Sequence, residues 1–496
     1  MITRYSDTTI VKSASLDEKY KRWQTVELAV IQARENLGQI PKDTHHDINA
    51  ILNDRPIDGK WIDEREKIVK HDLNAFIEER MRHLPVELQA YWHKGMTSYD
   101  TEEAAFAMML SEACLQISMA TSGLLREIRN LSIKYRYTPM NGRTHGQEAE
   151  MQSFGKRCLT WYCDLRAAQA TLRQQMDNLK YSKLSGAIGT NSGVSPEVEE
   201  EALKLLGLLP WIGATQIMPR VLYAPIADAL ANQVLVVEKI ALDIRLMSRS
   251  GHPLCHEPFG KLQKGSSAMP HKKNNIGCEN TAGMATMAAK YAEGIRQNIV
   301  TWEERAIEQS CVERVFWPDL FHVTIKALKT MTSIVGGMKV YPDNMMIEII
   351  ESRGTYASNA AKEFLTEHGL QVGLSREECY RIVQLACANA FQPSEIAQTM
   401  REVISKDLME ADNDMDTMKE ICAQTKIISI CTIIEEASLR TDTMLDADKD
   451  TVAGWNKKLD ALFRDEGIVG SWNNLFLPSY SLVNEDHLFQ KAFDII

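Results

Sequence analysis

Two polar segments hold the residue types that proton transfer requires. GSSAMPHKKNN, Gly265 to Asn275, places a serine, a lysine and an asparagine within a short stretch of sequence. The second segment, NGRTHGQEAE, Asn141 to Glu150, contains His145. An imidazole exchanges a proton near neutral pH, which suits a general acid or base. Taken singly, each segment is typical of an ordinary surface loop, so the case depends on the two together.

Together the segments supply the parts of an elimination at a carbon beside a carboxylate. Ser266 provides an oxygen, Lys272 a fixed positive charge and Asn274 a hydrogen-bond donor. Removing a proton from such a carbon spreads charge onto the carboxylate, and cations and N–H groups stabilise that charge. A second group must protonate the leaving atom. His145 is the candidate, and Glu279 is a carboxylate that could hold its imidazole in one tautomer.

Other chemistries find less support in the sequence. There is no G-x-x-x-x-G-K-[ST] phosphate loop, no dinucleotide fingerprint after a strand pattern and no G-x-S-x-G elbow. GHPLCHE places His252, Cys255 and His256 close together, but no fourth zinc ligand is evident. We therefore expect neither a metal nor a cofactor.

Composition restricts the partners. The net charge of -11 argues against general nucleic-acid affinity, while leaving room for one basic pocket for an anionic metabolite. The N-terminus has no apolar signal region, and no run approaches the ~18 apolar residues of a membrane span. We expect a cytosolic protein with a small-molecule substrate. The ten cysteines, without a C-x-x-C pair, indicate free thiols in a reducing compartment: Cys114, Cys158, Cys163, Cys255, Cys278, Cys311, Cys379, Cys387, Cys422 and Cys431.

Long helices must position these residues. Lys156 to Ser185 contains no Gly or Pro, and Ile226 to Ser250 follows Pro225 and precedes Gly251. Leu235, Leu242 and Leu246 add apolar surface outside the main stripe of the second segment, which favours contact with other subunits. The main stripe recurs at steps of three and four residues through Ile226, Leu230, Val234, Val237, Ala241 and Ile244.

The division of the chain is predicted from these patterns. We expect a helical part at 1–99, a long-helix bundle at 100–353 and a C-terminal part at 354–496. KIISICTII, Lys426 to Ile434, fits a strand or a helix. The last thirty residues, which begin with GIVGSWNNLFLPSY (Gly467 to Tyr480), are predicted to pack irregularly, with Trp472, Leu475 and Phe476 buried.

GSSAMPHKKN resembles the GSSxMPxKxN segment of the fumarase/aspartase superfamily, whose members release fumarate by β-elimination. Within that superfamily the chain is similar to the adenylosuccinate lyases. The segments that carry this similarity, in order, are RYSD (4–7), GQIPKD (38–43), HD (71–72), TSYD (97–100), GRTHGQ (142–147), SGAIGT (185–190), TQ (215–216) and WEER (302–305).

The resemblance implies an all-α fold of three helical domains, a homotetramer with a shared helical core, and active sites built from three subunits. It implies Ser266 as the base on a flexible loop, His145 as the acid oriented by Glu279, and Lys272 and Asn274 on the succinyl carboxylates. The reactions would be adenylosuccinate to AMP, and the succinylated imidazole carboxamide ribotide to its carboxamide, each with fumarate. The substrate pocket would be lined by Arg4, Tyr5, Lys70, His71, Asp72, Thr97, Ser98, Thr144, Gln216, Arg305 and Ser310.

Several positions depart from that family's pattern, mainly where the nucleotide end is expected. Asn359 stands where a phosphate-contacting arginine is expected, and this change would lose a bidentate charged contact. Two alternatives stay open: a lyase acting on another succinyl-amine or argininosuccinate, and a non-catalytic helical scaffold. The other departures are Glu102 to Ala107, Val221, Asn275, Ala306 and Gln309.

Overall fold

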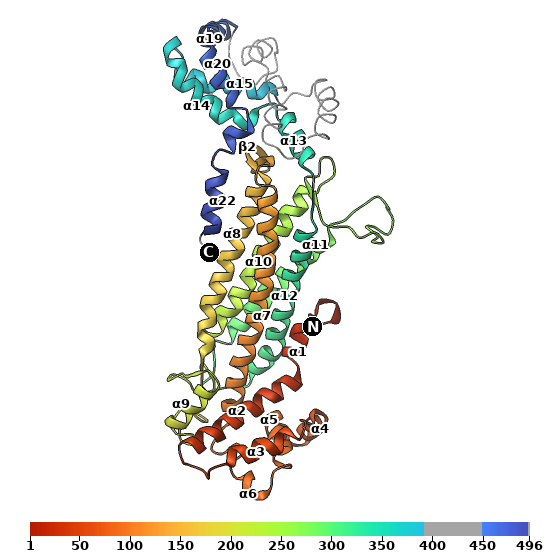
Figure 1. Ribbon diagram of the computed structural model, residues 1–496, viewed down its shortest axis with the longest axis vertical. Helices are drawn as coiled ribbons and strands as arrows, with labels where there is room; N and C mark the ends of the chain where they lie inside the picture. Colours follow the sequence, from red (N-terminus) through yellow and green to blue (C-terminus); the bar gives the residue numbers. More distant parts are fainter. Residues whose placement is uncertain (391–448, 495–496) are drawn as a thin grey trace. The chain divides into compact units, whose positions relative to one another are not determined.

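The computed structural model describes residues 1–390 and 449–494. Within these ranges the chain is helical, and its strands form only short two-stranded pairs, which confirms the all-α prediction (Figure 1). The segment 426–434 and the cysteines at 422 and 431 lie outside the described residues. Two compact units are present, and the division into three domains stays a prediction.

The first unit comprises 1–126, 164–242 and 274–334. A cluster of short helices forms its N-terminal part, where Trp23 and Phe76 pack edge to face with ring centres 5.4 Å apart. The Ser15 hydroxyl caps the helix that carries Trp23, accepting from the Glu18 N–H at 3.2 Å. The elements are η1 (Thr3–Tyr5), α1 (Thr8–Ser13), α2 (Leu16–Asn36), α3 (Thr44–Asn53), α4 (Gly59–Val69), α5 (Asp72–Met81) and α6 (Val86–Gln89).

Long helices lie side by side in the rest of the first unit (Figure 1). Phe106 contacts the rings of Tyr223 and Trp317, and Thr121 donates to the Gln233 side chain at 2.8 Å. By length and composition alone, Ser98–Lys134 and Arg220–Met247 could cross a membrane, which is weak evidence because mostly buried core helices pass the same test. The long helices, most of whose residues belong to the first unit, are α7 (Ser98–Lys134), α8 (Phe154–Gln175), α10 (Ala224–Met247), α11 (Ile276–Gln297) and α12 (Glu308–Gly336).

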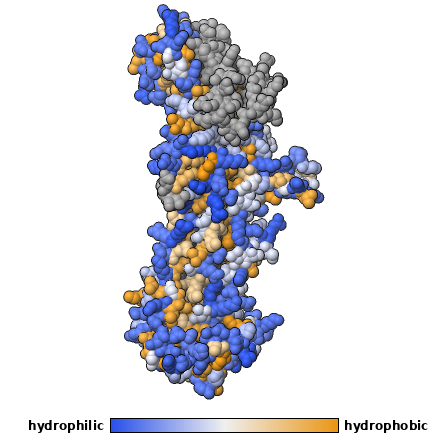
Figure 2. Space-filling model, viewed as in Figure 1, coloured by the Kyte–Doolittle hydropathy of each residue, from blue (hydrophilic) through white to orange (hydrophobic). Residues whose placement is uncertain are grey.

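The helical stripe predicted for α10 is confirmed, because all six of its residues are fully buried. Three leucines of α10 that lie outside this stripe are exposed instead. Leu235, Leu242 and Leu246 are 43%, 48% and 47% exposed in the single chain. Hydrophobic surface also appears among hydrophilic surface along the long helices in Figure 2.

The helix expected over 156–185 ends earlier than predicted. α8 stops at Gln175, and η2 (Met176–Lys180) and β3 (Tyr181–Ser182) follow. Lys183 is fully buried against Asp100, so a tertiary ion pair overrides the local helical pattern here. The remaining elements of the unit are α9 (Pro196–Leu205), β4 (Leu209–Pro210), which pairs in parallel with β3, and η3 (Arg220–Leu222).

The second unit comprises 127–163, 243–273 and 335–496. The prediction for Gly467 to Tyr480 is half right: Trp472, Leu475 and Phe476 are buried, but the segment is helical rather than irregular. Asp465 caps the helix there through the Gly467 N–H at 2.8 Å. The elements are β1 (Pro139–Thr144), β2 (Gln147–Ser153), β5 (Cys255–His256), β6 (Lys339–Val340), α13 (Pro342–Glu351), η4 (Thr355–Ala357), α14 (Ser358–Gly369), η5 (Leu370–Val372), α15 (Arg376–Ala390), α19 (Lys449–Leu462), α20 (Glu466–Asn474), α21 (Pro478–Ser481) and α22 (Glu485–Asp494).

Candidate active site

The predicted base lies on the loop between β5 and α11. Ser266 Oγ accepts hydrogen bonds from the backbone N–H groups of Ala268 at 3.3 Å and Met269 at 3.1 Å. The turn is tight, because a Cβ added at Gly265 would lie 1.8 Å from the Lys272 carbonyl oxygen. Amide dipoles directed at an oxygen favour its anionic form. The loop therefore supplies part of the environment that a serine base needs.

The other residues of this segment follow in order toward α11. Lys272 is exposed, and its N–H donates to the Met269 carbonyl at 3.0 Å. Asn274 is half-buried just ahead of α11. Glu279 lies in the first turn of that helix with an exposed side chain, and its N–H donates to the Asn275 carbonyl at 3.0 Å.

The predicted acid occupies the tip of the hairpin formed by β1 and β2, a segment that the sequence indicated only as a loop. His145 and Gly146 form the two-residue turn, with φ of 54° and 78°. Positive φ at both central positions defines a type I′ turn, whose twist matches paired strands. The His145 side chain is exposed, and no hydrogen bond joins it to Ser266 in the part of the chain that the structure describes.

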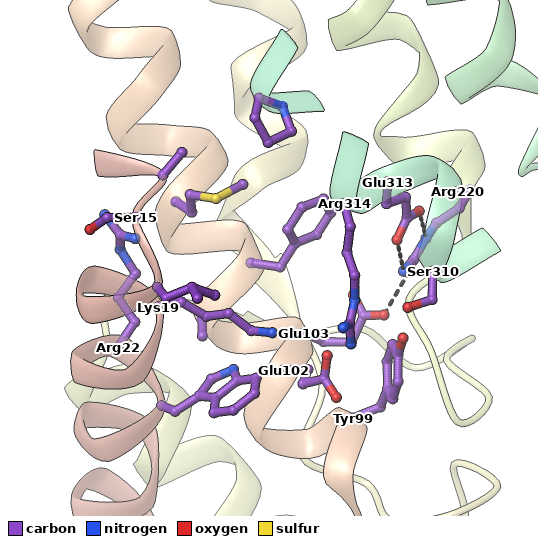
Figure 3. Close-up of a pocket in the computed structure, with 17 residues that line it drawn as sticks. Ser15, Lys19, Arg22, Tyr99, Glu102, Glu103, Arg220, Ser310, Glu313 and Arg314 are labelled. Carbon is purple, nitrogen blue, oxygen red and sulfur yellow. Dashed lines mark hydrogen bonds and ion pairs between the residues drawn. The ribbon is translucent and has the colours of Figure 1, made fainter. Parts of the chain in front are cut away.

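A cavity of about 250 Å³ lies in the first unit among α2, α7 and α12 (Figure 3). Ser310 is the predicted substrate-binding residue that lines it. The wall combines apolar side chains such as Trp23 and Phe106 with charged ones, so the cavity suits a ligand with a flat apolar part and an anionic group. Its polar lining includes Lys19, Arg22, Tyr99, Glu102, Ser310 and Arg314.

Asp72 organises two of the cations in this region. Its Oδ2 accepts from Lys19 Nζ at 3.0 Å and from Arg314 Nη2 at 2.7 Å. Burial alone would raise the pKa of Asp72, but the charges of Lys19 and Arg314 outweigh it and hold that pKa below its ordinary value. His71 directly precedes it as the cap of α5, its Nδ1 accepting from the Asn74 N–H at 3.4 Å.

Two further predicted residues contact each other beside Tyr99. Arg305 Nη1 donates to Gln216 Oε1 at 2.9 Å, and the Arg305 guanidinium lies 3.8 Å from the centre of the Tyr99 ring. Burial raises the pKa of Tyr99 to about 12, and the nearby charge of Glu102 adds to this effect. The Tyr99 ring and the Gln216 amide oxygen together orient the Arg305 guanidinium.

A buried ion network supports the start of α12. Arg220 donates to both carboxylate oxygens of Glu313, at 2.6 and 2.9 Å, and to Glu103 at 2.7 Å. Glu313 directly precedes Arg314, so the network fixes the helical turn that presents Arg314 to the cavity. Val221, one of the departures from the family pattern, is 54% exposed and takes no part in this network.

The remaining predicted residues lie at element boundaries. Lys70 ends α4 with φ of 59°, and the Thr97 N–H donates to Asp100 Oδ2 at 2.8 Å just before α7. Ser98 is the first residue of α7. Arg4 and Tyr5 lie in η1, and Thr144 ends β1 with an exposed side chain.

The sequence analysis did not predict Lys19 or Arg314 as residues of the cavity, and it named Glu102 only within the segment 102–107 that departs from the family pattern. One signal was available, because Ser310 and Arg314 are four positions apart on a helix and therefore share a face. No comparable sequence signal pointed to Lys19, and the departure at 102–107 gave Glu102 no role. These two residues lie on α2 and α7 and meet the others only through tertiary packing.

The GHPLCHE segment has other contacts in the structure. His252 Nδ1 lies 3.5 Å from a Glu351 carboxylate oxygen, and the His256 ring packs against Tyr341 with centres 5.7 Å apart. Cys255 is buried. Among the described residues no group of three or more His, Cys, Asp or Glu side chains is arranged to hold a metal ion.

Comparison with known proteins identifies the family of this chain. The family described as Lyase matches residues 7–289, which include the Ser266 loop, the His145 hairpin and Glu279. Adenylosuccinate lyase of Thermotoga maritima is 38% identical over 77% of this chain and 87% of its own length, and that of Aquifex aeolicus is 36% identical over 82% and 91%. The chain belongs to the adenylosuccinate lyase family.

This member of the adenylosuccinate lyase family also resembles solved structures in its fold. A fumarate lyase from Mesorhizobium sp. BNC1 has a TM-score of 0.75, with 20% identity over 99% of this chain and 98% of that one. A 3-carboxy-cis,cis-muconate lactonizing enzyme from Pseudomonas putida has a TM-score of 0.73, with 17% identity over 99% and 97%. The resemblance inferred from the GSSxMPxKxN segment is confirmed.

Proposed function

We propose that this protein is a carbon–nitrogen lyase of purine biosynthesis. It cleaves adenylosuccinate to AMP and fumarate, and the succinylated imidazole carboxamide ribotide to its carboxamide and fumarate. The observation that carries the proposal is the pair of backbone N–H groups directed at Ser266 Oγ, inside the loop whose sequence is the superfamily signature. Those dipoles stabilise the alkoxide that the base must become.

The elimination then needs only side chains and backbone groups of the protein. Ser266 Oγ takes a proton from the succinyl carbon, and the electron pair left there spreads onto the adjacent carboxylate. Lys272 and Asn274 stabilise that charge. As the C–N bond breaks, its electrons leave with the nitrogen, the carbon–carbon double bond of fumarate forms, and His145 donates a proton to the nitrogen. Glu279 keeps the imidazole oriented for this transfer.

The cavity of the first unit suits the nucleotide end of the substrate. Arg314 and Lys19 are cations that a phosphate requires, and Ser310 adds a hydroxyl donor. Asn359 stands where the family pattern has an arginine. Its side-chain amide donates a hydrogen bond to Glu150 Oε1 at 3.3 Å and so contacts a residue of β2. The proposal therefore assigns phosphate binding to Arg314 and Lys19, with Arg4 and Lys70 as further cations.

The assembly is proposed as a cytoplasmic homotetramer with shared active sites. Apolar side chains are exposed on the outer faces of α7 and α10, including Leu115 at 54%, Met119 at 69% and Leu242 at 48%. Helices of four chains packed along these faces would bury this surface. The exposed position of His145 at a hairpin tip fits a residue that completes the site of a neighbouring subunit.

Fumarate release tests the function directly. Purified protein is mixed with adenylosuccinate, and fumarate and AMP are quantified for the wild type, Ser266→Ala, His145→Ala and Ser267→Ala. Ser267 is the neighbouring exposed serine, and its variant serves as the matched control. We expect the first two variants to lose at least about a thousandfold in rate and the control to stay within about threefold.

Two results would favour the other readings. Fumarate from argininosuccinate or another succinyl-amine, with none from adenylosuccinate, would identify a related lyase and give the change at Asn359 a role in specificity. No fumarate from any of these substrates would indicate a helical scaffold without activity.

A further inference from the structure

Glu102 differs from the other acidic groups around the cavity. Asp72 binds two cations, and Glu103 and Glu313 bind Arg220. Glu102 lines the cavity from α7, yet no hydrogen bond or ion pair to its carboxyl is found among the described residues. In Figure 3 the Glu102 carboxyl is drawn beside the end of the Arg314 side chain and next to Tyr99. An acid left without a protein partner in a ligand-sized cavity is a candidate for a functional group.

Charged groups from several elements face Glu102. Burial raises its pKa to about 7, and the negative charge of Asp72 adds to the rise, against the opposing positive charges. The carboxyl can therefore gain or lose a proton near neutral pH. The charged and titratable groups that face it are Asp72 of α5, Lys19 of α2, Arg314 of α12, Arg305 of the segment before α12, and Tyr99 of α7.

The charge of this group of residues depends on Glu102. Lys19, Arg305 and Arg314 carry three positive charges, and Asp72 one negative charge. With Glu102 neutral, the net charge is +2; with Glu102 ionised, it is +1. A phosphate monoester is close to a dianion above neutral pH, so it matches the state with neutral Glu102. A carboxylate beside the phosphate would instead repel it in a poorly solvated site.

We propose that Glu102 is a proton-linked specificity residue, and that the protein takes up a proton at Glu102 when a phosphate monoester binds beside Arg314 and Lys19. The inference rests on the proposed function, because it assigns the phosphate of the nucleotide to this cavity. Proton uptake removes the repulsion and leaves Arg314 and Lys19 to bind the phosphate oxygens. Ligands whose group at this position is neutral bind without the uptake.

Calorimetric titration of the full-length protein with AMP tests the proposal. At pH 7.5, titrations in two buffers of different ionisation enthalpy give the number of protons taken up. We expect about three quarters of a proton for the wild type and none for Glu102→Gln. Between pH 6.5 and 8.5 the wild-type Kd should rise about twentyfold, while that of Glu102→Gln stays flat.

Glu112→Gln is the matched control. Glu112 lies on the same helix, pairs with Arg22 at 2.5 Å and is not a lining residue of the cavity, so this variant should take up protons as the wild type does. Equal uptake by the wild type and Glu102→Gln would overturn the inference. So would AMP binding weakened at least tenfold in Glu102→Gln at both pH values, since the carboxylate would then bind the ligand directly.

The two proposals fail differently. Suppose that the wild type cleaves adenylosuccinate but that proton uptake equals that of Glu102→Gln, or that AMP binding to Glu102→Gln is weakened at both pH values. The proposed function then stands, and only the role of Glu102 is rejected. A wild type that neither cleaves adenylosuccinate nor binds AMP removes both.

Discussion

Asp100 and Lys183 form a fully buried ion pair, with 2.6 Å between Oδ1 and Nζ. Asp100 also accepts from the backbone N–H groups of Thr97 at 2.8 Å and Gly186 at 3.1 Å. Lys183 donates to the carbonyls of Gly186 at 2.7 Å and Gln216 at 3.2 Å. One pair of side chains thus holds together three segments that carry the family resemblance, and two of them contain predicted substrate-binding residues.

Breaking this pair should cost stability. Lys183→Met leaves the Asp100 carboxylate buried without its partner, and we expect the free energy of unfolding to fall by about 3–5 kcal/mol. The double variant with Asp100→Asn should recover part of the loss, because no charge is then left unpaired. Urea unfolding of the three proteins measures both effects, and a single variant as stable as the wild type would contradict the assignment.

The tight turn of the loop that carries Ser266 should tolerate only glycine at position 265. In Gly265→Ala the new Cβ would lie 1.8 Å from the Lys272 carbonyl oxygen, which displaces the amides that surround Ser266 Oγ. We expect kcat to fall at least about a hundredfold, with little change in Tm because the loop is mostly exposed. Gly260→Ala, whose nearest contact would be 3.7 Å away, is the control and should keep its activity.

The hairpin turn allows the chemistry of His145 to be separated from its conformation. Asn-Gly is the preferred pair for a type I′ turn, so His145→Asn should keep the hairpin and the Tm. It has no group that exchanges a proton near neutral pH, and we expect kcat to fall about 10²–10⁴-fold. Thermal unfolding and fumarate release check the two parts. A variant that keeps wild-type kcat would exclude His145 as the acid.

Glu102 should also make stability depend on pH. Its pKa is raised to about 7 in the folded protein, above its ordinary value of 4.5, so the folded state holds this proton more tightly than the unfolded state. Stability is therefore lost as the pH rises from 4.5 to about 7, and the full penalty remains above that. Glu102→Gln should raise the Tm relative to the wild type at pH 8 and change it little at pH 4.5. If the difference in Tm between Glu102→Gln and the wild type is the same at pH 4.5 and pH 8, the raised pKa of Glu102 is contradicted.

Much of the fold follows from local sequence patterns. α10 was predicted at 226–250 and runs Ala224–Met247, because its apolar stripe is continuous and lies between Pro225 and Gly251. The end of α8 was not predictable in the same way. Nothing local stops a helix before Lys183, and the chain leaves the helix because Lys183 must reach Asp100.

The candidate site also contains residues that local sequence predicts and residues that only tertiary packing brings together. Ser266, Lys272 and Asn274 could be predicted from the sequence because they occur together in one short segment of a recognised signature, and their roles stay a prediction. Arg314 and the surroundings of Glu102 became visible only through packing. α5 brings Asp72 to Arg314, and no hydrogen bond or ion pair to the Glu102 carboxyl is found in the part of the chain that the structure describes. The type I′ turn was missed because His-Gly is not one of the usual pairs for it, although Gly146 supplies one of the two positive φ angles.

A mixing experiment tests most directly the claim that Ser266 and His145 act on one substrate from different subunits. Ser266→Ala and His145→Asn are each assayed alone, then mixed, dissociated and reassembled together. The account predicts at most about a hundredth of the wild-type activity from either variant alone. In equal mixtures it predicts recovery toward about a quarter of the wild-type sites, because a site can draw its intact serine and histidine from two chains. If mixed assemblies form and remain as inactive as the separate variants, the account is contradicted.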